Sequence, residues 1–364
     1  MSIYDSVPSL LPADVQDLST AVYKGIFGKP SLEQFHGVRT GIKGATRIPI
    51  MGGFSGLLGS IKADCDTTAD AGSISTTAKQ WAPKYISGRV EMCYADLMGT
   101  YAQWLMANGL AKENLQNTGA FAQYATEMIG DALNEAVLRL AWLGDTGLEA
   151  GDTNEINSGN VGYFTPIDGF WKQLVAIATT DTTKRITIAK NTGDTIANQA
   201  FTGTDTTNQV VTGYFTSAHR NADLRLKSKN ASEKIIIATD SMCEQYRAER
   251  KLASGIDAAY NRVENGIDTL MCDGIEVVPF SLLDRYLKAY FQVTASSKTT
   301  VINPHRFVLT TRAALANLLI ATEQTANLQE LDVNYDKKSK TWFADYGFML
   351  DAKVANDDAV MVGY

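Results

Sequence analysis

The feature that most constrains this 364-residue sequence is a long apolar segment over residues 119–145, GAFAQYATEMIGDALNEAVLRLAWLGD. As a helix it would be roughly 39 Å long, at about 1.5 Å per residue. Its polar residues recur every three or four positions and form one narrow stripe: Gln123, Thr126, Glu127, Asp131, Asn134, Glu135 and Arg139. A surface helix normally buries only one apolar stripe about 100° wide. The sequence therefore predicts a helix that spans a domain and is covered over most of its perimeter.

Composition narrows the class of protein. A chain of 364 residues favours two or three domains, and 40 acidic against 33 basic residues give a net charge of −7. This balance argues against tight, sequence-independent nucleic-acid binding, which needs clustered Lys and Arg. The four cysteines form no CxxC pair and indicate a reducing compartment. The first residues lack a signal-peptide pattern, and no apolar run is long enough to predict a membrane span.

Residues 37–93 are predicted to form a long two-stranded extension. Their two ends, TRIPI and KQWAPKYISGRVEMCY, are strand-like, and glycines and a polar Asp/Thr tract lie between them. A two-stranded hairpin is marginally stable by itself in water. We therefore expect this segment to lie across a neighbouring molecule. Residues 1–36, with three prolines and a short amphipathic helix over 13–27, are expected to pack on another body too.

The rest of the sequence predicts a series of helices and strands. A helical segment over 94–112 precedes the long helix, which we expect over 118–143 after the capping candidates Asn117 and Thr118. An α+β block follows, with expected helices over 169–180, 206–229 and 241–254, strands over 185–190 and 233–240, a hairpin around Asp273–Gly274, and a strand running into a helix over 306–320. The tail alternates strands with turns at Asp336–Lys337 and Asn356–Asp357, and its last strand reaches the final residue.

No motif for catalysis or metal binding emerges. The histidines His36, His219 and His305 have no metal-ligand spacing and are expected at solvent or turn positions. The stretch MGGFSGLLGS lacks the Lys-Ser/Thr ending of a phosphate loop and fails the G-x-S-x-G pattern of a nucleophile elbow. We interpret it as a flexible interaction loop.

The carboxylate pairs Asp357–Asp358 and Glu127–Asp131 could bind a cation or serve as acid and base, but solvated positions explain both. Cys243 follows a strand at the start of a helix, where a thiol pKa can fall, yet burial is the simpler expectation. The basic run over 225–234 is interpreted as a solvated helix end, with a phosphate or neighbour contact as the alternative. The sequence thus predicts no catalytic, cofactor or metal site.

Taken in order, these segments resemble the tailed-phage major capsid proteins of the HK97-like fold. The resemblance is carried by an arm (1–36), an extended loop (37–93) that closes with WAPKYISGRVEMCYADL, a spine helix (118–143), the motifs EKIIIATDSMCEQY and MCDGIEVVPFSLLD, and the end YGFMLDAKVANDDAVMVGY. It implies an α+β chain with a peripheral domain over 94–168 and an axial domain over 169–290. Residues 291–364 would complete both domains.

The resemblance implies a structural protein without enzymatic activity or cofactor. Its copies would form pentamers and hexamers of an icosahedral or prolate shell that encloses double-stranded DNA in the virion. Assembly would occur in the host cytoplasm, with separate scaffolding, portal and decoration proteins and no membrane. The extended-loop residues implied as intersubunit contacts are Ile50, Phe54, Leu57, Leu58, Trp81 and Tyr85. The implied spine residues are Phe121, Met128, Leu133, Val137 and Leu140.

Three alternatives stay open. A cellular compartment of the encapsulin type would use the same fold to hold a protein cargo. An α+β enzyme needs a convergent polar cluster, which scattered residues can supply without a motif. A tail-tube subunit is disfavoured by the long helix, because such subunits are mostly β.

Overall fold

The computed structural model describes residues 35–42, 44, 46–55, 73–93, 103, 106, 118–150, 156, 161–254, 260–264, 267–295, 298–312, 316–323, 330–336 and 341–364. The helix expected over 13–27, most of that expected over 94–112, and the middle of the extended loop lie outside these residues. In the part described, no helix is both long and apolar enough to cross a membrane.

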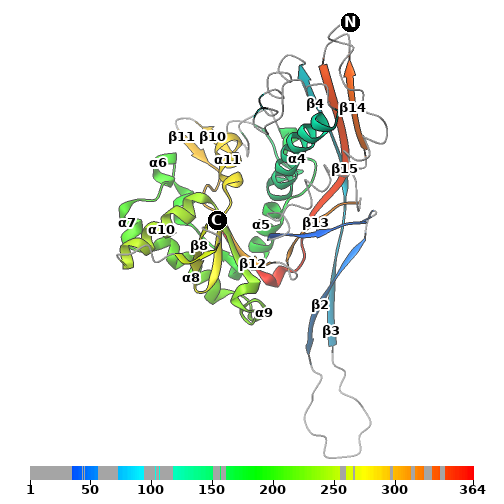
Figure 1. Ribbon diagram of the computed structural model, residues 1–364. Helices are drawn as coiled ribbons and strands as arrows, with labels where there is room; N and C mark the ends of the chain where they lie inside the picture. The colour runs from blue at the N-terminus through cyan, green and yellow to red at the C-terminus, as the bar shows by residue number, and fades with distance from the viewer. Residues whose placement is uncertain are drawn as a thin grey trace, which may run out of the picture.

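A seven-stranded sheet forms the centre of an α/β body (Figure 1). In spatial order its strands are β5 (Arg185–Ile186), β16 (Val360–Gly363), β12 (Phe307–Thr311), β6 (Lys234–Ala238), β9 (Ile275–Pro279), β8 (Ile267–Cys272) and β7 (Tyr260–Glu264). The helices of this body are α5 (Phe170–Thr180), α6 (Ile196–Gln199), α7 (Gly203–Thr207), α8 (Val210–Asn221), α9 (Leu224–Lys227), α10 (Asp240–Ser254) and α11 (Ser281–Tyr290). A small hairpin, β10 (Gln292–Ala295) with β11 (Lys298–Val301), follows α11. Short 3-10 turns complete the described chain: η3 (Val161–Tyr163), η4 (Thr182–Lys184), η5 (Ala189–Thr192), η6 (Ala231–Glu233) and η8 (Asp357–Ala359).

Strand β6 explains why the sheet is covered on both faces. All five of its residues are buried, as expected for a central strand with an unbroken apolar run. Because side chains alternate along a strand, Ile235 and Ile237 enter one core, which also contains side chains of α4, α5 and α11. Ile236 and Ala238 enter a second core, against α8 and α10. The sheet is therefore the middle layer of the α/β body.

A second sheet forms a long ribbon beside this body. Its central strand, β15 (Thr341–Val354), pairs with β4 (Lys84–Cys93), β14 (Glu330–Asp336) and β13 (Leu318–Ala321), and β13 pairs in parallel with β1 (Gly37–Arg39). The long helix α4 (Thr118–Leu143) lies along this ribbon (Figure 1). It stops at Gly144, where an added Cβ would lie 2.5 Å from the carbonyl oxygens of Leu140 and Ile167.

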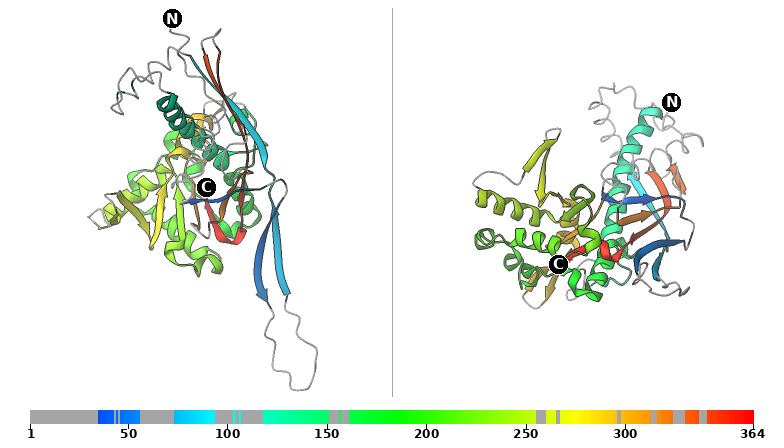
Figure 2. Two further views of the ribbon diagram at one scale, coloured as in Figure 1. Left: turned by 45° about the vertical axis from the view of Figure 1, so that its right-hand side comes forward. Right: turned by 90° about the horizontal axis from the view of Figure 1, so that it is seen from below.

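A separate two-stranded hairpin, β2 (Arg47–Ser55) and β3 (Ser73–Gln80), projects away from both sheets (Figures 1 and 2). Its register shifts between Met51 and Phe54, at the Gly52–Gly53 pair. A bulge at such a position increases the local twist of the hairpin.

Several sequence-based expectations are confirmed. The long helix covers the predicted residues 118–143, and β16 ends one residue before the chain does. Asp273 and Gly274 link β8 to β9 with positive φ angles of 50° and 79°, which a two-residue hairpin turn of type I′ requires.

Others are wrong. Within residues 306–320 the expected strand is β12, but residues from Leu318 on, where the helix was expected, form the strand β13; residues 313–315 lie outside the described part. The helix expected over 206–229 is three helices, because Gln209 adopts a left-handed conformation and Asp223 caps a new helix. The strand expected over 185–190 is only β5. The strand-like end of the extended loop is two strands separated by Trp81–Ala82–Pro83, so β4 belongs to the ribbon sheet.

Candidate intersubunit surfaces

The base of the β2–β3 hairpin is fixed in its own chain. Trp81 follows β3 and is only 3% exposed, packed in a cluster with Leu319 and Ala321 of β13. Its backbone N–H donates to the carbonyl oxygen of Thr46 at 2.9 Å, which closes the hairpin at its root. The prediction that Trp81 contacts a neighbouring subunit is therefore wrong, because its own chain already covers the side chain.

Two further contacts hold the root against the end of β15. The backbone N–H of Ala82 donates to the Asp351 carboxylate at 2.7 Å, and the Lys79 ammonium donates to the Val354 carbonyl oxygen at 2.7 Å. Asp351 is buried, and this burial raises the pKa of its carboxyl group. These contacts set the direction in which the hairpin leaves the body.

The turn at Asp357–Asp358 connects this root to the α/β body. Lys79 binds the Asp357 carboxylate at 2.5 Å, while Asp358 binds Lys184 at 2.9 Å and Arg225 at 2.7 Å. Both carboxylates lie in a turn and stay partly exposed, as expected, and they also form ion pairs. Exposed ion pairs contribute little to stability, typically about 0–1 kcal/mol. These ion pairs fix the position of the hairpin. Asp357 binds the hairpin root through Lys79, and the adjacent Asp358 binds helix α9 through Arg225.

Of the other predicted contact residues, Ile50 and Phe54 belong to β2, and Tyr85 is an exposed residue of β4. Leu57 and Leu58 lie outside the described residues. The intersubunit role of these five residues stays a prediction.

Two residues of the polar stripe of α4, Glu135 and Arg139, contact α11 or its surroundings, whereas Asp131 is exposed. Glu135 accepts hydrogen bonds from Arg285 and from the Tyr286 hydroxyl, and the Arg285 contact lowers the pKa of Glu135. The Arg139 guanidinium lies over the rings of Tyr163 and Tyr286, at 5.2 and 5.6 Å from their centroids. The stripe thus joins the long helix to the α/β body.

The apolar side of α4 enters the main core. Leu133, Val137 and Leu140 are buried there, whereas Phe121 and Met128 belong to the part of α4 whose side chains are not described. Near the end of the helix, the Trp142 indole N–H donates to Nε2 of the buried His36 at 2.9 Å. His36 lies at a bend, in keeping with the expected turn position, but it is buried and not exposed to solvent.

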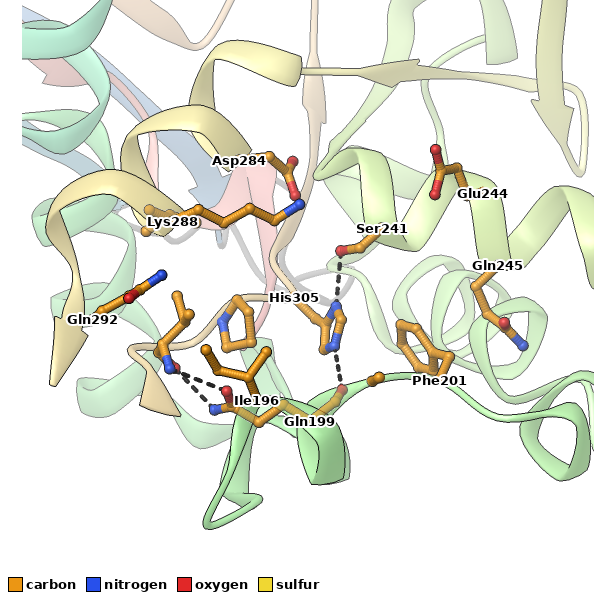
Figure 3. A pocket seen from close by; sticks show the side chains of 14 residues that line it. Ile196, Gln199, Phe201, Ser241, Glu244, Gln245, Asp284, Lys288, Gln292 and His305 are labelled. Carbon is orange, nitrogen blue, oxygen red and sulfur yellow. Dashed lines mark hydrogen bonds between the residues drawn. The ribbon is translucent and has the colours of Figure 1, made fainter. Parts of the chain in front are cut away.

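A cavity of about 490 Å³ lies between α6, α10, α11 and β11 (Figure 3). His305 lies at a bend, in keeping with the expected turn position, and is buried at the wall of the cavity. Its Nε2 contacts the Gln199 carbonyl oxygen at 2.6 Å, and its Nδ1 contacts the Ser241 hydroxyl at 2.8 Å. A carbonyl can only accept, so Nε2 carries the proton and Nδ1 accepts from Ser241. Burial lowers the pKa of His305, which favours this neutral form.

This Ser–His contact lies beside the N-terminus of α10. Acyl transfer also needs hydrogen-bond donors aimed at a developing oxyanion. At the start of α10 the backbone N–H of Asp240 instead donates to the Asp284 carboxylate at 2.7 Å. That carboxylate already occupies the helix terminus and would repel a second negative charge. The Ser241–His305 contact therefore serves to tie α6 to α10.

Across the described ranges, no three His, Cys, Asp or Glu side chains are placed to hold a metal ion. Cys243 is buried, as expected, and burial raises the pKa of its thiol. In the basic run, Lys234 is buried and donates to the Lys227 carbonyl oxygen at 3.0 Å, so it is not a solvated side chain.

The residues that anchor the hairpin, such as Lys79 and Asp351, carry no local sequence signal. Their contacts join positions about 270 residues apart, as the separation of Lys79 and Val354 shows. Pro83 was the one local signal, because a proline lacks the N–H that a continuous strand needs. It marks the root of the hairpin.

The projecting hairpin, the long helix beside a β-ribbon, and the α/β body together form the HK97-like capsid fold, of the α+β class. Among solved structures, a chain of Gordonia phage Cozz matches with a TM-score of 0.50 and 10% identity, over 90% of this chain and 84% of that one. A capsid structure of cyanophage P-SCSP1u matches at 0.47 and 13%, over 91% and 86%. The holo-SrpI encapsulin complex of Synechococcus elongatus PCC 7942 matches at 0.40 and 11%, over 90% and 84%. No protein-family model and no curated protein matches the sequence.

Proposed function

We propose that this chain is a structural shell subunit, specifically the major capsid protein of a tailed phage. The observation that carries the proposal is the projecting hairpin. Among the described elements, β2 and β3 make extensive contacts only with each other. A two-stranded hairpin needs a further strand or another body for stability. Other copies of the chain supply that body.

In this proposal the α/β body is the axial domain, and α4 with the ribbon sheet is the peripheral domain. The extended loop is the β2–β3 hairpin with its connecting residues, since β4 pairs within the ribbon sheet. Pentamers and hexamers of this chain build the shell in the host cytoplasm. Scaffolding, portal and decoration proteins act as separate partners.

The charge of the chain fits a container for DNA. A net charge of −7 disfavours tight, sequence-independent binding to phosphates, so the wall encloses the genome without immobilising it. The polar side chains of Glu135, Ser241, His305 and Asp284 make contacts within the chain, which supports a protein without enzymatic activity.

The test is assembly of the purified chain, measured by size-exclusion chromatography and negative-stain electron microscopy. We expect pentamers, hexamers or closed shells. A monomer under all conditions would contradict the proposal. Particles isolated from cells with protein cargo and no DNA would favour a compartment of the encapsulin type over a phage capsid.

A hairpin variant isolates the feature that carries the proposal. Residues 49–78 are replaced by a short Gly–Ser turn, while Lys79 and Trp81 keep the root in place. Because no residue of β2 or β3 whose side chain is described belongs to the two cores of the α/β body, the variant should fold with an unchanged urea midpoint but form no shells. Normal shells from this variant would refute the assigned role of the hairpin.

A further inference from the structure

We propose, building on the shell function above, that helix α9 of one copy docks into the cleft beside α6 of the next copy. The α/β bodies would then associate head to tail around a ring. The partner is a second copy of this chain, and the contact is separate from that of the β2–β3 hairpin.

The receiving surface is the cavity of about 490 Å³ described above (Figure 3). Pockets of roughly 300–1,000 Å³ accommodate several groups of a partner. Apolar residues from three segments line it, among them Phe201, Leu287 and Val301. Ile196 is also part of the lining and is 46% exposed, so it adds to the apolar surface that the cleft shows to solvent. The cleft therefore presents apolar surface to a partner.

The inserting surface is α9. Its first residue, Leu224, is 77% exposed, the highest value among the large apolar side chains described. The helix beneath it is firmly held, because Leu226 is buried and the Asp223 side chain accepts from the Arg225 backbone N–H at 2.8 Å. The Arg225 guanidinium also binds Asp358. Leu224 is thus an exposed apolar side chain on a fixed support.

The two surfaces lie on opposite sides of the α/β body. In Figure 1, α6 and α11 lie along its upper side and α9 along its lower side. A contact between different patches on two identical chains repeats from copy to copy and closes into a ring when the rotation allows. The β2–β3 hairpin extends downward from the same side as α9, and α9 contacts the η8 turn that binds the hairpin root. A single neighbouring copy can therefore contact both helix α9 and the β2–β3 hairpin.

Charge favours the same pairing. The cleft lining contains two carboxylates, Glu244 and Asp284, and one ammonium, Lys288. The segment around Leu224 has Arg225, Lys227 and Lys229 against one carboxylate, Asp223; Arg225 already binds Asp358, so the two lysines supply the net positive charge. An acidic cleft and a basic insert attract each other and disfavour the reversed orientation.

Disulfide trapping tests the contact directly. Ile196→Cys and Leu224→Cys are combined in a chain with Cys65→Ser and Cys93→Ser, and assembled particles are oxidised. Disulfides form only when Cα atoms are about 4.4–6.8 Å apart. We expect a ladder of covalent multimers on a non-reducing gel. The matched control pairs Ile196→Cys with Leu252→Cys, an α10 leucine that is 59% exposed, and should give no ladder.

The outcomes separate this inference from the shell function. Shells that form without the ladder, or a control that gives an equal ladder, overturn the α9 contact and leave the shell function standing. Failure of the parent chain to assemble overturns both. As a second measurement, Leu224→Asp should lower the assembled fraction at least roughly tenfold, because an aspartate in an apolar cleft loses its hydration. Its urea midpoint should be unchanged, and normal assembly of this variant would also overturn the proposal.

Discussion

The substitution Asp284→Asn should stabilise the chain at neutral pH. Asp284 is buried in α11, and burial raises the pKa of its carboxyl group from 3.8 to about 6, against the opposing hydrogen bond from the Asp240 backbone. The difference of about two pKa units corresponds to about 3 kcal/mol, at 1.36 kcal/mol per unit. Asparagine keeps an oxygen that can accept from the same N–H but carries no charge. We therefore expect the variant to be about 3 kcal/mol more stable at pH 8.

The pH dependence follows from the sign of the shift. A carboxyl group with a raised pKa in the folded state favours folding fully below its unfolded value of 3.8. That contribution is lost as the pH rises to about 6 and above. The variant and the parent chain should therefore have equal stability near pH 3.5, and the gap between them should open between pH 4 and pH 6.

The assay is urea unfolding of the unassembled chain by circular dichroism at several pH values. Glu244→Gln is the matched control, because this carboxylate lies in the same cleft but is exposed. The control should stay within about 0.5 kcal/mol of the parent chain throughout. An Asp284→Asn variant that is less stable than the parent at pH 8 would refute the reasoning. It would mean that the charge stabilises the start of α10 by more than burial costs.

Three further results are expected. Trp81→Ala should lower the free energy of local unfolding at the hairpin root by about 3–5 kcal/mol, because it opens a cavity there. Hydrogen exchange at the Ala82 amide should become faster, and unchanged exchange would contradict the prediction. Trp142→Phe removes the donor to His36 Nε2 and should cost about 1–3 kcal/mol in urea unfolding. Cys243 should resist iodoacetamide at pH 8 until the chain unfolds, since burial raises its thiol pKa; peptide mass spectrometry detects any modification of the folded chain.

The sequence was most informative where one local pattern decides the outcome. The apolar pattern of residues 118–143 defined α4 at both ends, and Asp273–Gly274 defined a hairpin turn. The prediction for residues 306–320 was partly wrong because a short apolar run fits a strand or a buried helix equally well. Pairing of Leu318–Ala321 with β1 and β15 makes it a strand, and those partners lie far away in the sequence.

The candidate surfaces were harder to predict for the same reason. The need for a partner could be inferred from the composition of residues 37–93, but the fixed root depends on contacts with residues 351–357. The exposure of Leu224 could not be predicted either. In the continuous helix that was expected, nothing distinguished Leu224 from the other apolar residues, whereas in the structure it begins a separate short helix.

The projecting hairpin is the central claim, and a high-resolution cryo-electron microscopy map of the assembled particle tests it most directly. The account predicts that β2 and β3 lie across the surface of an adjacent copy, with Trp81 still buried in its own chain. A map in which residues 47–80 fold back on their own subunit, with no neighbour touching them, would contradict it.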